Sequence, residues 1–187
     1  SVFVRGDAMK HEPFRLTAPP LFGVSAESSD EWYTPQWLLA ALPPVDLDPC
    51  SDPGRETPAD RHYVGAEGED GLALPWSDRV WVNPPYSDLT RWCAKAADHA
   101  ARNDPAYVIA LIPFRPEGFW HGTVWSARWI AHTKRRIVFE HPRGCPSAGA
   151  GRFPSALVIW GREASKAKRH LASKLKHVPI QWIAPGR

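Results

Sequence analysis

At 187 residues, 43% of them hydrophobic, the chain is long enough for one hydrophobic core and too short for two ordinary domains. No apolar run approaches the roughly 20 residues of a bilayer-spanning helix, and the first residues lack the apolar core of a signal peptide. We therefore expect a soluble protein of the cytoplasm, with reduced thiols at Cys50, Cys93 and Cys145. Although the formal net charge is only +3, residues 132–187 hold 12 of the 23 basic and 2 of the 20 acidic side chains. This imbalance indicates a polyanionic partner, while a solvated basic helix is the simpler alternative.

The predicted elements begin after an unpatterned amino-terminal stretch. Residues 1–29 show no period and contain the turn-rich TAPPLFGVS, so we expect a loosely attached lead-in followed by one domain over residues 30–187. Thr34 fits the N-cap of a short helix that starts at Pro35. The apolar face of this helix holds Trp37, Leu38 and Ala41.

The later elements follow from apolar periodicity and from the turn residues between them. VDLDPC at 45–50 predicts a strand that ends at a proline, a short strand fits 61–64, and RVWV predicts a strand before Asn83. Ser87 fits the cap of a helix whose buried face holds Leu89, Trp92, Cys93 and Ala96. Further along we expect a fully buried strand at 107–114, a helix from 117 to about 127, strands at 136–140 and 154–161, a basic helix at 162–177 and a last strand at 178–184.

The alternation of strands and helices predicts an α/β fold with a mostly parallel sheet and helices on both faces. In such sheets, functional sites gather at the carboxyl ends of the strands. Two polar, proline-containing segments, DPC and NPPY, stand at predicted strand ends. We therefore expect both segments to belong to one site.

The segment Asn83-Pro84-Pro85-Tyr86 follows a strand that it cannot continue. Asn83 offers a side-chain carbonyl, and Pro84 offers a backbone carbonyl on a stiff chain. Two acceptors fixed close together can bind both hydrogens of a planar amino group and direct its nitrogen lone pair at an electrophile. The ring of Tyr86 supplies a face on which an extruded base can stack, worth roughly 1–3 kcal/mol. The residues thus predict a clamp for an exocyclic amino group, and a rigid turn without function is the alternative.

Beyond this segment, the chain resembles a known family. EWYTPQWLLAAL, VDLDPCSDP, EDGLALPW, VWVNPPYSD, VIALIPFRPEGFWH, RRIVFE and GRFPSALVIWG occur in the order and approximate spacing of the phage-type Dam DNA N6-adenine methyltransferases. The resemblance runs from about Glu31 to Gly161. It implies a Rossmann-like methyltransferase fold, S-adenosylmethionine as cofactor and adenine flipped out of DNA as target.

The resemblance also implies roles for individual residues. The catalytic segment is Asn83, Pro84, Pro85 and Tyr86. The implied cofactor-binding residues are Tyr33, Thr34 and Pro35 beside the methionine part, Asp48, Pro49 and Cys50 at the first strand end, and Asp70 at the adenine. The run DPCSDPGRE departs from many amino-methyltransferases, because its only glycine is Gly54. The acid expected at the ribose is not identified, and Glu56, Asp60 and Glu67 are its candidates.

Positive charge near the predicted site indicates DNA contacts. Arg115 follows a predicted strand, and the other candidates are Arg135, Arg136, Arg143 and Arg152 around a glycine-rich loop. We expect them to bind mostly phosphates, which gives affinity without sequence information. The spacing of His132, His141 and Cys145 matches no familiar metal site, so no metal is predicted.

The sequence therefore predicts an adenine-specific DNA methyltransferase that acts on double-stranded DNA, without a membrane and without an obligatory protein partner. Two alternatives stay open. The same clamp suits any planar amino group, so cytosine N4 or a protein amide could be the target. The unusual first motif also allows a non-catalytic DNA-binding protein on the same fold.

Overall fold

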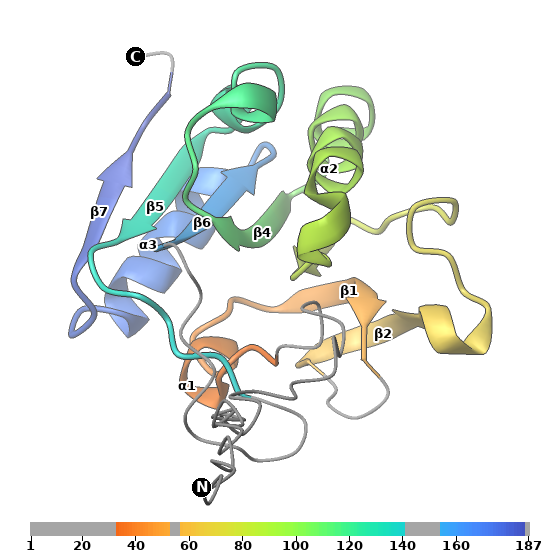
Figure 1. The fold of residues 1–187 in the computed structure, drawn as a ribbon, viewed down its shortest axis with the longest axis horizontal. Coiled ribbons are helices and arrows are strands. Elements are labelled where there is room, and N and C mark those ends of the chain that lie inside the picture. Colours follow the sequence, from red (N-terminus) through yellow and green to blue (C-terminus); the bar gives the residue numbers. More distant parts are fainter. Residues whose placement is uncertain (1–32, 53–56, 141–153, 186–187) are drawn as a thin grey trace, which may run out of the picture.

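The structure is a computed structural model that describes residues 33–52, 57–140 and 154–185. Within these residues the chain forms one seven-stranded sheet with three α-helices (Figure 1). The strands are β1 (Val45–Ser51), β2 (Ala59–Val64), β3 (Arg79–Val82), β4 (Tyr107–Pro113), β5 (Trp129–Thr133), β6 (Ser155–Trp160) and β7 (Ile180–Ile183). The helices are α1 (Gln36–Leu39), α2 (Leu89–Asn103) and α3 (Ala164–Lys174), and short 3-10 turns are η1 (Gly65–Glu67), η2 (Tyr86–Asp88), η3 (Gly118–Trp120) and η4 (Val124–Ser126). No helix in this part of the chain is both long and apolar enough to cross a bilayer.

The sheet is mixed, with the order β2-β1-β3-β4-β6-β5-β7. β1 pairs in parallel with β2 and β3, and β3 pairs in parallel with β4. β6 is antiparallel to both β4 and β5, and β7 is antiparallel to β5. Strands β1 to β5 therefore run in one direction and β6 and β7 in the other. The predicted α/β class is confirmed, but the sheet is not mostly parallel, because three of its six strand pairs are antiparallel. The carboxyl ends of β1 to β5 lie at one end of the sheet.

The core consists of two clusters that take alternate residues of the central strand. Val108, Ala110 and Ile112 of β4 pack in the cluster that holds the buried residues of α2. Ile109 and Leu111 pack in the cluster that holds the buried residues of α1 and α3. Every residue of β4 is buried, which confirms the predicted strand with two covered faces.

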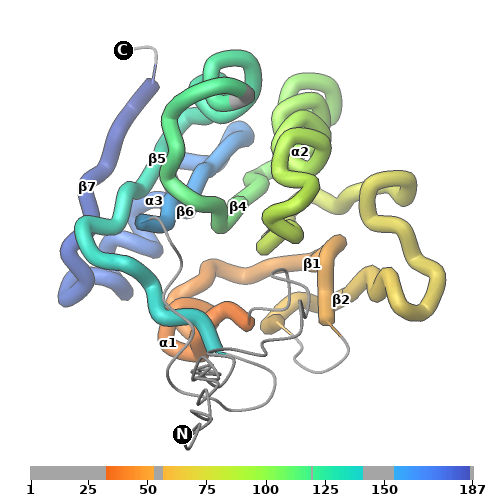
Figure 2. The backbone as a smooth tube through the Cα atoms, in the orientation of Figure 1, coloured from red at the N-terminus to blue at the C-terminus, as the bar shows by residue number. Residues whose placement is uncertain are grey.

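The region between β4 and β6 differs from the predicted elements. The predicted helix 117–127 is wrong, because Gly118 adopts a left-handed φ of 60° and only η3 and η4 form. The predicted strand 136–140 is also wrong. The partner of β6 is β5, which the sequence reasoning missed. Residues 136–140 form isolated bridges instead of a strand, among them the bridge between Glu140 and Tyr33. Figure 2 follows this path from β5 across to the neighbourhood of α1.

Both predicted helix caps are also corrected. The residue before α1 is Pro35 rather than Thr34, and α1 has only four residues, with Trp37 exposed instead of on a buried face. The residue before α2 is Asp88 rather than Ser87, because η2 occupies Tyr86–Asp88, and neither cap makes a side-chain hydrogen bond. The predicted buried face of α2 is confirmed for Trp92, Cys93 and Ala96. The predicted lead-in, residues 1–29, lies outside the described residues.

Candidate active site

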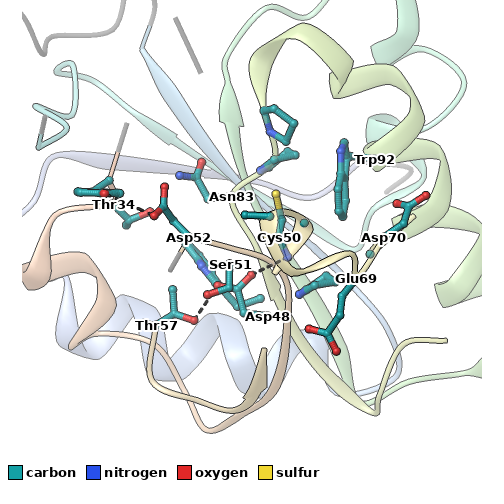
Figure 3. Close-up of a pocket in the computed structure, with 18 of the residues that line it drawn as sticks. Thr34, Asp48, Cys50, Ser51, Asp52, Thr57, Glu69, Asp70, Asn83 and Trp92 are labelled. Carbon is teal, nitrogen blue, oxygen red and sulfur yellow. Dashed lines mark hydrogen bonds between the residues drawn. The ribbon is translucent and has the colours of Figure 1, made fainter. Parts of the chain in front are cut away.

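A cavity of about 630 Å³ opens at the carboxyl ends of β1 and β3 (Figure 3). Open α/β sheets bind their ligands at this end, where the parallel strands finish. The lining residues are Tyr33, Thr34, Leu39, residues 48–52, Thr57, residues 65, 66 and 68–71, Trp81, residues 83–86, Trp92 and Phe139. The cavity thus brings together segments that are distant in the sequence.

The segment after β3 has all four of its predicted residues on the cavity wall. Asn83 is half-buried with its Oδ1 atom buried, and Pro84 is buried. Pro85 has φ −59° and ψ 133°, and its carbonyl oxygen accepts a hydrogen bond from Asp88 N at 3.1 Å. The turn that follows is therefore closed on the carbonyl of Pro85 and does not use that of Pro84. The rings of Pro84 and Pro85, which lie between Asn83 and Tyr86, restrict the backbone of this segment.

The ring of Tyr86 also meets an aromatic side chain from a distant segment. Its centroid lies 6.4 Å from that of Phe139, and the two ring planes are at 90°. Burial raises the pKa of Tyr86 to about 12, so the hydroxyl stays neutral near pH 7. The side chain therefore offers an uncharged aromatic ring rather than a base.

Asp48 is the middle residue of β1, which continues to Ser51 instead of ending at the proline as predicted. Its side chain is a buried carboxylate, because only 2% of the residue's surface is exposed. Its Oδ1 accepts a hydrogen bond from Cys50 N at 3.0 Å, and its Oδ2 accepts one from Thr57 Oγ1 at 2.7 Å. Burial raises the pKa of Asp48, while these two bonds and the nearby His62 oppose the rise. Asp48 thereby fixes the backbone of β1 at Cys50, in the stretch where the register with β2 shifts.

The Cys50 thiol faces the same acidic surroundings. Burial, together with the charges of Asp48 and Asp52, raises the pKa of Cys50 to about 12. Burial also raises the pKa of Cys93 to about 12. Because the thiolate is the nucleophilic form, neither thiol is suited to attack a substrate.

The segment after η1 carries acidic side chains to the opposite side of the cavity, where Figure 3 shows Glu69 and Asp70. Glu69 Oε2 accepts a hydrogen bond from Val64 N at 3.1 Å, and Asp70 Oδ1 accepts one from Leu72 N at 2.8 Å. Through this hydrogen bond, the exposed side chain of Asp70 also stabilises the turn that begins at Asp70. Both carboxylates line the cavity.

Tyr33 and Thr34 form the wall on the side of α1. Tyr33 exchanges two backbone hydrogen bonds with Glu140, of 2.9 and 3.0 Å, and its hydroxyl donates to Asp52 Oδ1 at 3.4 Å. Thr34 is buried. Pro35, predicted to border the cofactor, is buried beside them but does not line the cavity.

The charged residues on the described cavity wall are all acidic: Asp48, Asp52, Glu69 and Asp70. Carboxylates gathered in a concave site attract a cationic ligand. Asp52, Glu69 and Phe139 were missed by sequence reasoning, whereas the ribose candidates Asp60 and Glu67 do not line the cavity. Glu56 lies outside the described residues. Among the described residues, no group of three or more His, Cys, Asp or Glu side chains could hold a metal ion.

The predicted DNA-binding arginines divide between described and undescribed parts of the chain. Arg115 follows β4, and Arg135 and Arg136 follow β5. All three therefore lie at the carboxyl end of the sheet, as the cavity does. They are exposed and do not line it. Arg143 and Arg152 lie outside the described residues.

The mixed sheet and the acidic cavity at the carboxyl ends of its strands define an α/β protein with a candidate site for a small ligand. The sequence model of one family, DNA N-6-adenine-methyltransferase (Dam), matches residues 23–178. The chain therefore belongs to the Dam family of DNA methyltransferases, which confirms the resemblance seen in the sequence. No curated protein and no solved structure matches the chain.

Proposed function

We propose that the protein transfers a methyl group from S-adenosylmethionine to the N6 amino group of adenine in double-stranded DNA. One observation carries this proposal: in a chain of the Dam family, Asn83 and Pro84, which directly follow β3, share a cavity with Asp48 of β1. We assign the fold to the Rossmann-like methyltransferases, as a single domain. The free thiols of Cys50 and Cys93 agree with a location in the reducing cytoplasm.

The cavity fits the proposed cofactor in size and in charge. A volume of about 630 Å³ lies within the usual range for small-ligand pockets. S-adenosylmethionine supplies an electrophilic methyl group and carries a net positive charge, which four carboxylates on the wall would attract. Tyr33, Thr34, Asp48, Pro49, Cys50 and Asp70 would hold it, and the missed residues Asp52 and Glu69 join this set. The hydroxyl group of Thr34, on the cavity wall, would donate a hydrogen bond to the cofactor's carboxylate.

The segment Asn83–Tyr86 would hold the target base. The Asn83 side-chain carbonyl and the Pro84 backbone carbonyl would accept the two hydrogens of the amino group and so orient its nitrogen. The ring of Tyr86 would stack on the base. A base paired in a duplex cannot reach this cavity, so the base must be flipped out. Arg115, Arg135 and Arg136 at the same sheet edge, and Arg143 and Arg152, would bind the phosphates.

The proposal is tested by incubating the purified protein with unmethylated duplex DNA and S-adenosylmethionine, then identifying the modified nucleoside after digestion. We expect N6-methyl-2′-deoxyadenosine from the wild type. Asn83→Ala and Tyr86→Ala should lose most of this activity and retain cofactor binding in calorimetry. N4-methylcytosine would move the target to cytosine, and DNA binding without cofactor binding would make the protein a non-catalytic DNA-binding module. Loss of cofactor binding in Asn83→Ala would make the segment structural.

A further inference from the structure

The four residues Ile137–Glu140, here called the strap, cross from β5 to the cavity (Figure 2). Ile137 and Phe139 are 4% and 5% exposed, whereas Val138 between them is 58% exposed. This alternation gives the strap an inner and an outer side. Its end is fixed by the two backbone hydrogen bonds between Glu140 and Tyr33 and by Glu140 Oε1, which accepts from Gln36 N at 3.3 Å.

The two inner residues of the strap differ in what they contact. Both pack in the core cluster of α1 and α3. Of the two, only Phe139 reaches the cavity, where it lies beside the ring of Tyr86 at a centroid distance of 6.4 Å and an angle of 90°. An edge-to-face pair at this distance is a favoured aromatic geometry.

The backbone before Tyr86 fixes the position of its Cα atom but not the direction of its ring. Pro84 and Pro85 restrict the chain up to Tyr86, and η2 begins there. The side-chain torsions of a tyrosine stay free until packing selects one rotamer. Phe139 supplies such packing through its edge-to-face contact with the ring. A stacking face that is held before the base arrives loses less entropy on binding than one that is free.

We propose that Phe139 is a positioning residue that holds the Tyr86 ring in the orientation in which the target base stacks on it. The strap is the element that carries Phe139 to this place, and its bond to Tyr33 fixes it against the cofactor side of the same cavity. This role rests on the proposed function, since it presupposes a base beside Tyr86. The proposal gives Phe139, the aromatic residue of RRIVFE, a role that follows neither from the chemistry of the Asn83–Tyr86 segment nor from membership of the family.

The experiment compares Phe139→Leu with Ile137→Ala, a matched control that removes strap packing from the same cluster without touching Tyr86. The rate of methyl transfer is measured in single turnover at saturating DNA and cofactor, beside the cofactor Kd and the Tm of each variant. We expect Phe139→Leu to slow transfer at least tenfold, with cofactor Kd within twofold of wild type. Ile137→Ala should lower Tm and leave the rate of the folded protein within twofold. Phe139→Tyr retains an aromatic ring and should restore the rate to within threefold.

A second comparison separates positioning from general packing. In a Tyr86→Ala background, Phe139→Leu should cause no further slowing, because the ring on which it acts is absent. Equal slowing in both backgrounds, or equal slowing by Phe139→Leu and Ile137→Ala, would overturn the positioning role while the wild type still methylates adenine. A wild type that methylates no adenine would overturn the proposed function, and this role with it.

Discussion

A β-carbon on Gly71 would lie 1.8 Å from the carbonyl oxygen of Pro49 and 2.9 Å from the ring of Trp92. Gly71 therefore stands where the segment that carries Asp70 meets the end of β1. Only a residue without a side chain permits this approach. The two acidic walls of the cavity are held at their present separation by this contact.

Gly71→Ala should force the Asp70 segment away from β1, because the contacted atom belongs to the backbone. We expect a loss of about 1–3 kcal/mol in the free energy of unfolding, the usual cost of overpacking. Affinity for S-adenosylmethionine should fall with it. Urea denaturation and calorimetry measure the two effects. Gly122→Ala is the matched control, since a β-carbon there meets nothing within 4 Å and Gly122 does not line the cavity. Equal effects at the two positions would contradict the packing argument.

Lys95 on α2 fixes the same segment from the outside. Its Nζ donates hydrogen bonds to Leu72 O at 2.9 Å and Leu74 O at 2.6 Å, and it lies 5.2 Å from the ring centre of Trp76. Trp76 Nε1 in turn donates to Gly71 O at 2.8 Å. Burial lowers the pKa of Lys95, and the charge of Asp70 opposes this shift.

Lys95→Met should leave two carbonyl groups without their donor and destabilise the protein by about 1–3 kcal/mol. Because the loosened segment carries Asp70, cofactor Kd should rise while DNA affinity stays near that of the wild type. Chemical denaturation and equilibrium binding measure both. Arg102→Met removes a positive charge from the same helix, where Arg102 only pairs with Asp98 on the surface, and should change little. A cofactor Kd that is unchanged in Lys95→Met would contradict the role of Lys95 in holding the Asp70 segment.

The parts of the site that were predicted from sequence are those that a short motif and a strand end define together. Asn83 was found because it follows the predicted strand RVWV, and Asp48 because it precedes the proline of VDLDPC. Both segments were expected at strand ends, where a parallel sheet places its sites. Asp52, Glu69 and Phe139 were missed because nothing local marks them. Phe139 reaches the cavity only through the pairing of Glu140 with Tyr33, a contact between residues far apart in the chain.

The errors in the predicted elements have a similar origin. The apolar alternation of RRIVFE correctly indicates burial, since Ile137 and Phe139 are both buried. Their side chains pack in the cluster of α1 and α3, but the segment is not one of the strands of the described sheet. The stretch from 129 to 133 pairs with β6 instead, although its polar His132 made it less conspicuous. Periodicity reports which side chains are buried and does not report their hydrogen-bond partners.

Asp48 predicts a specific dependence of stability on pH. Its pKa is raised in the folded protein, so above that pKa the buried charge lowers the free energy of unfolding. As the pH falls through the folded pKa towards the ordinary value of 3.8, protonation relieves this cost. Asp48→Asn lacks the charge at every pH, so it should be more stable than the wild type at neutral pH, with the difference shrinking in acid.

The same substitution should weaken cofactor binding roughly tenfold, which is about 1.4 kcal/mol, because the cavity loses one negative charge. Urea denaturation of both proteins across the acid range, together with calorimetry at pH 7, tests both effects. Asp60→Asn removes an exposed carboxylate from β2 outside the cavity and should change neither quantity. A constant stability difference between wild type and Asp48→Asn at all pH values would show that the charge of Asp48 is not its cause.

The direction of β5 predicts which arginines contact DNA. β5 ends at Thr133 on the edge that holds the cavity, so Arg135 and Arg136 follow it there, whereas Arg128 precedes the strand at the opposite edge. All three are exposed. Each phosphate contact releases counterions, so losing one lowers the slope of log K against log salt by about 0.9. Arg135→Gln and Arg136→Gln should each show this decrease with duplex DNA of any sequence, measured by anisotropy over a salt series. Arg128→Gln should keep the wild-type slope, and an equal decrease in that variant would place the DNA on a different face.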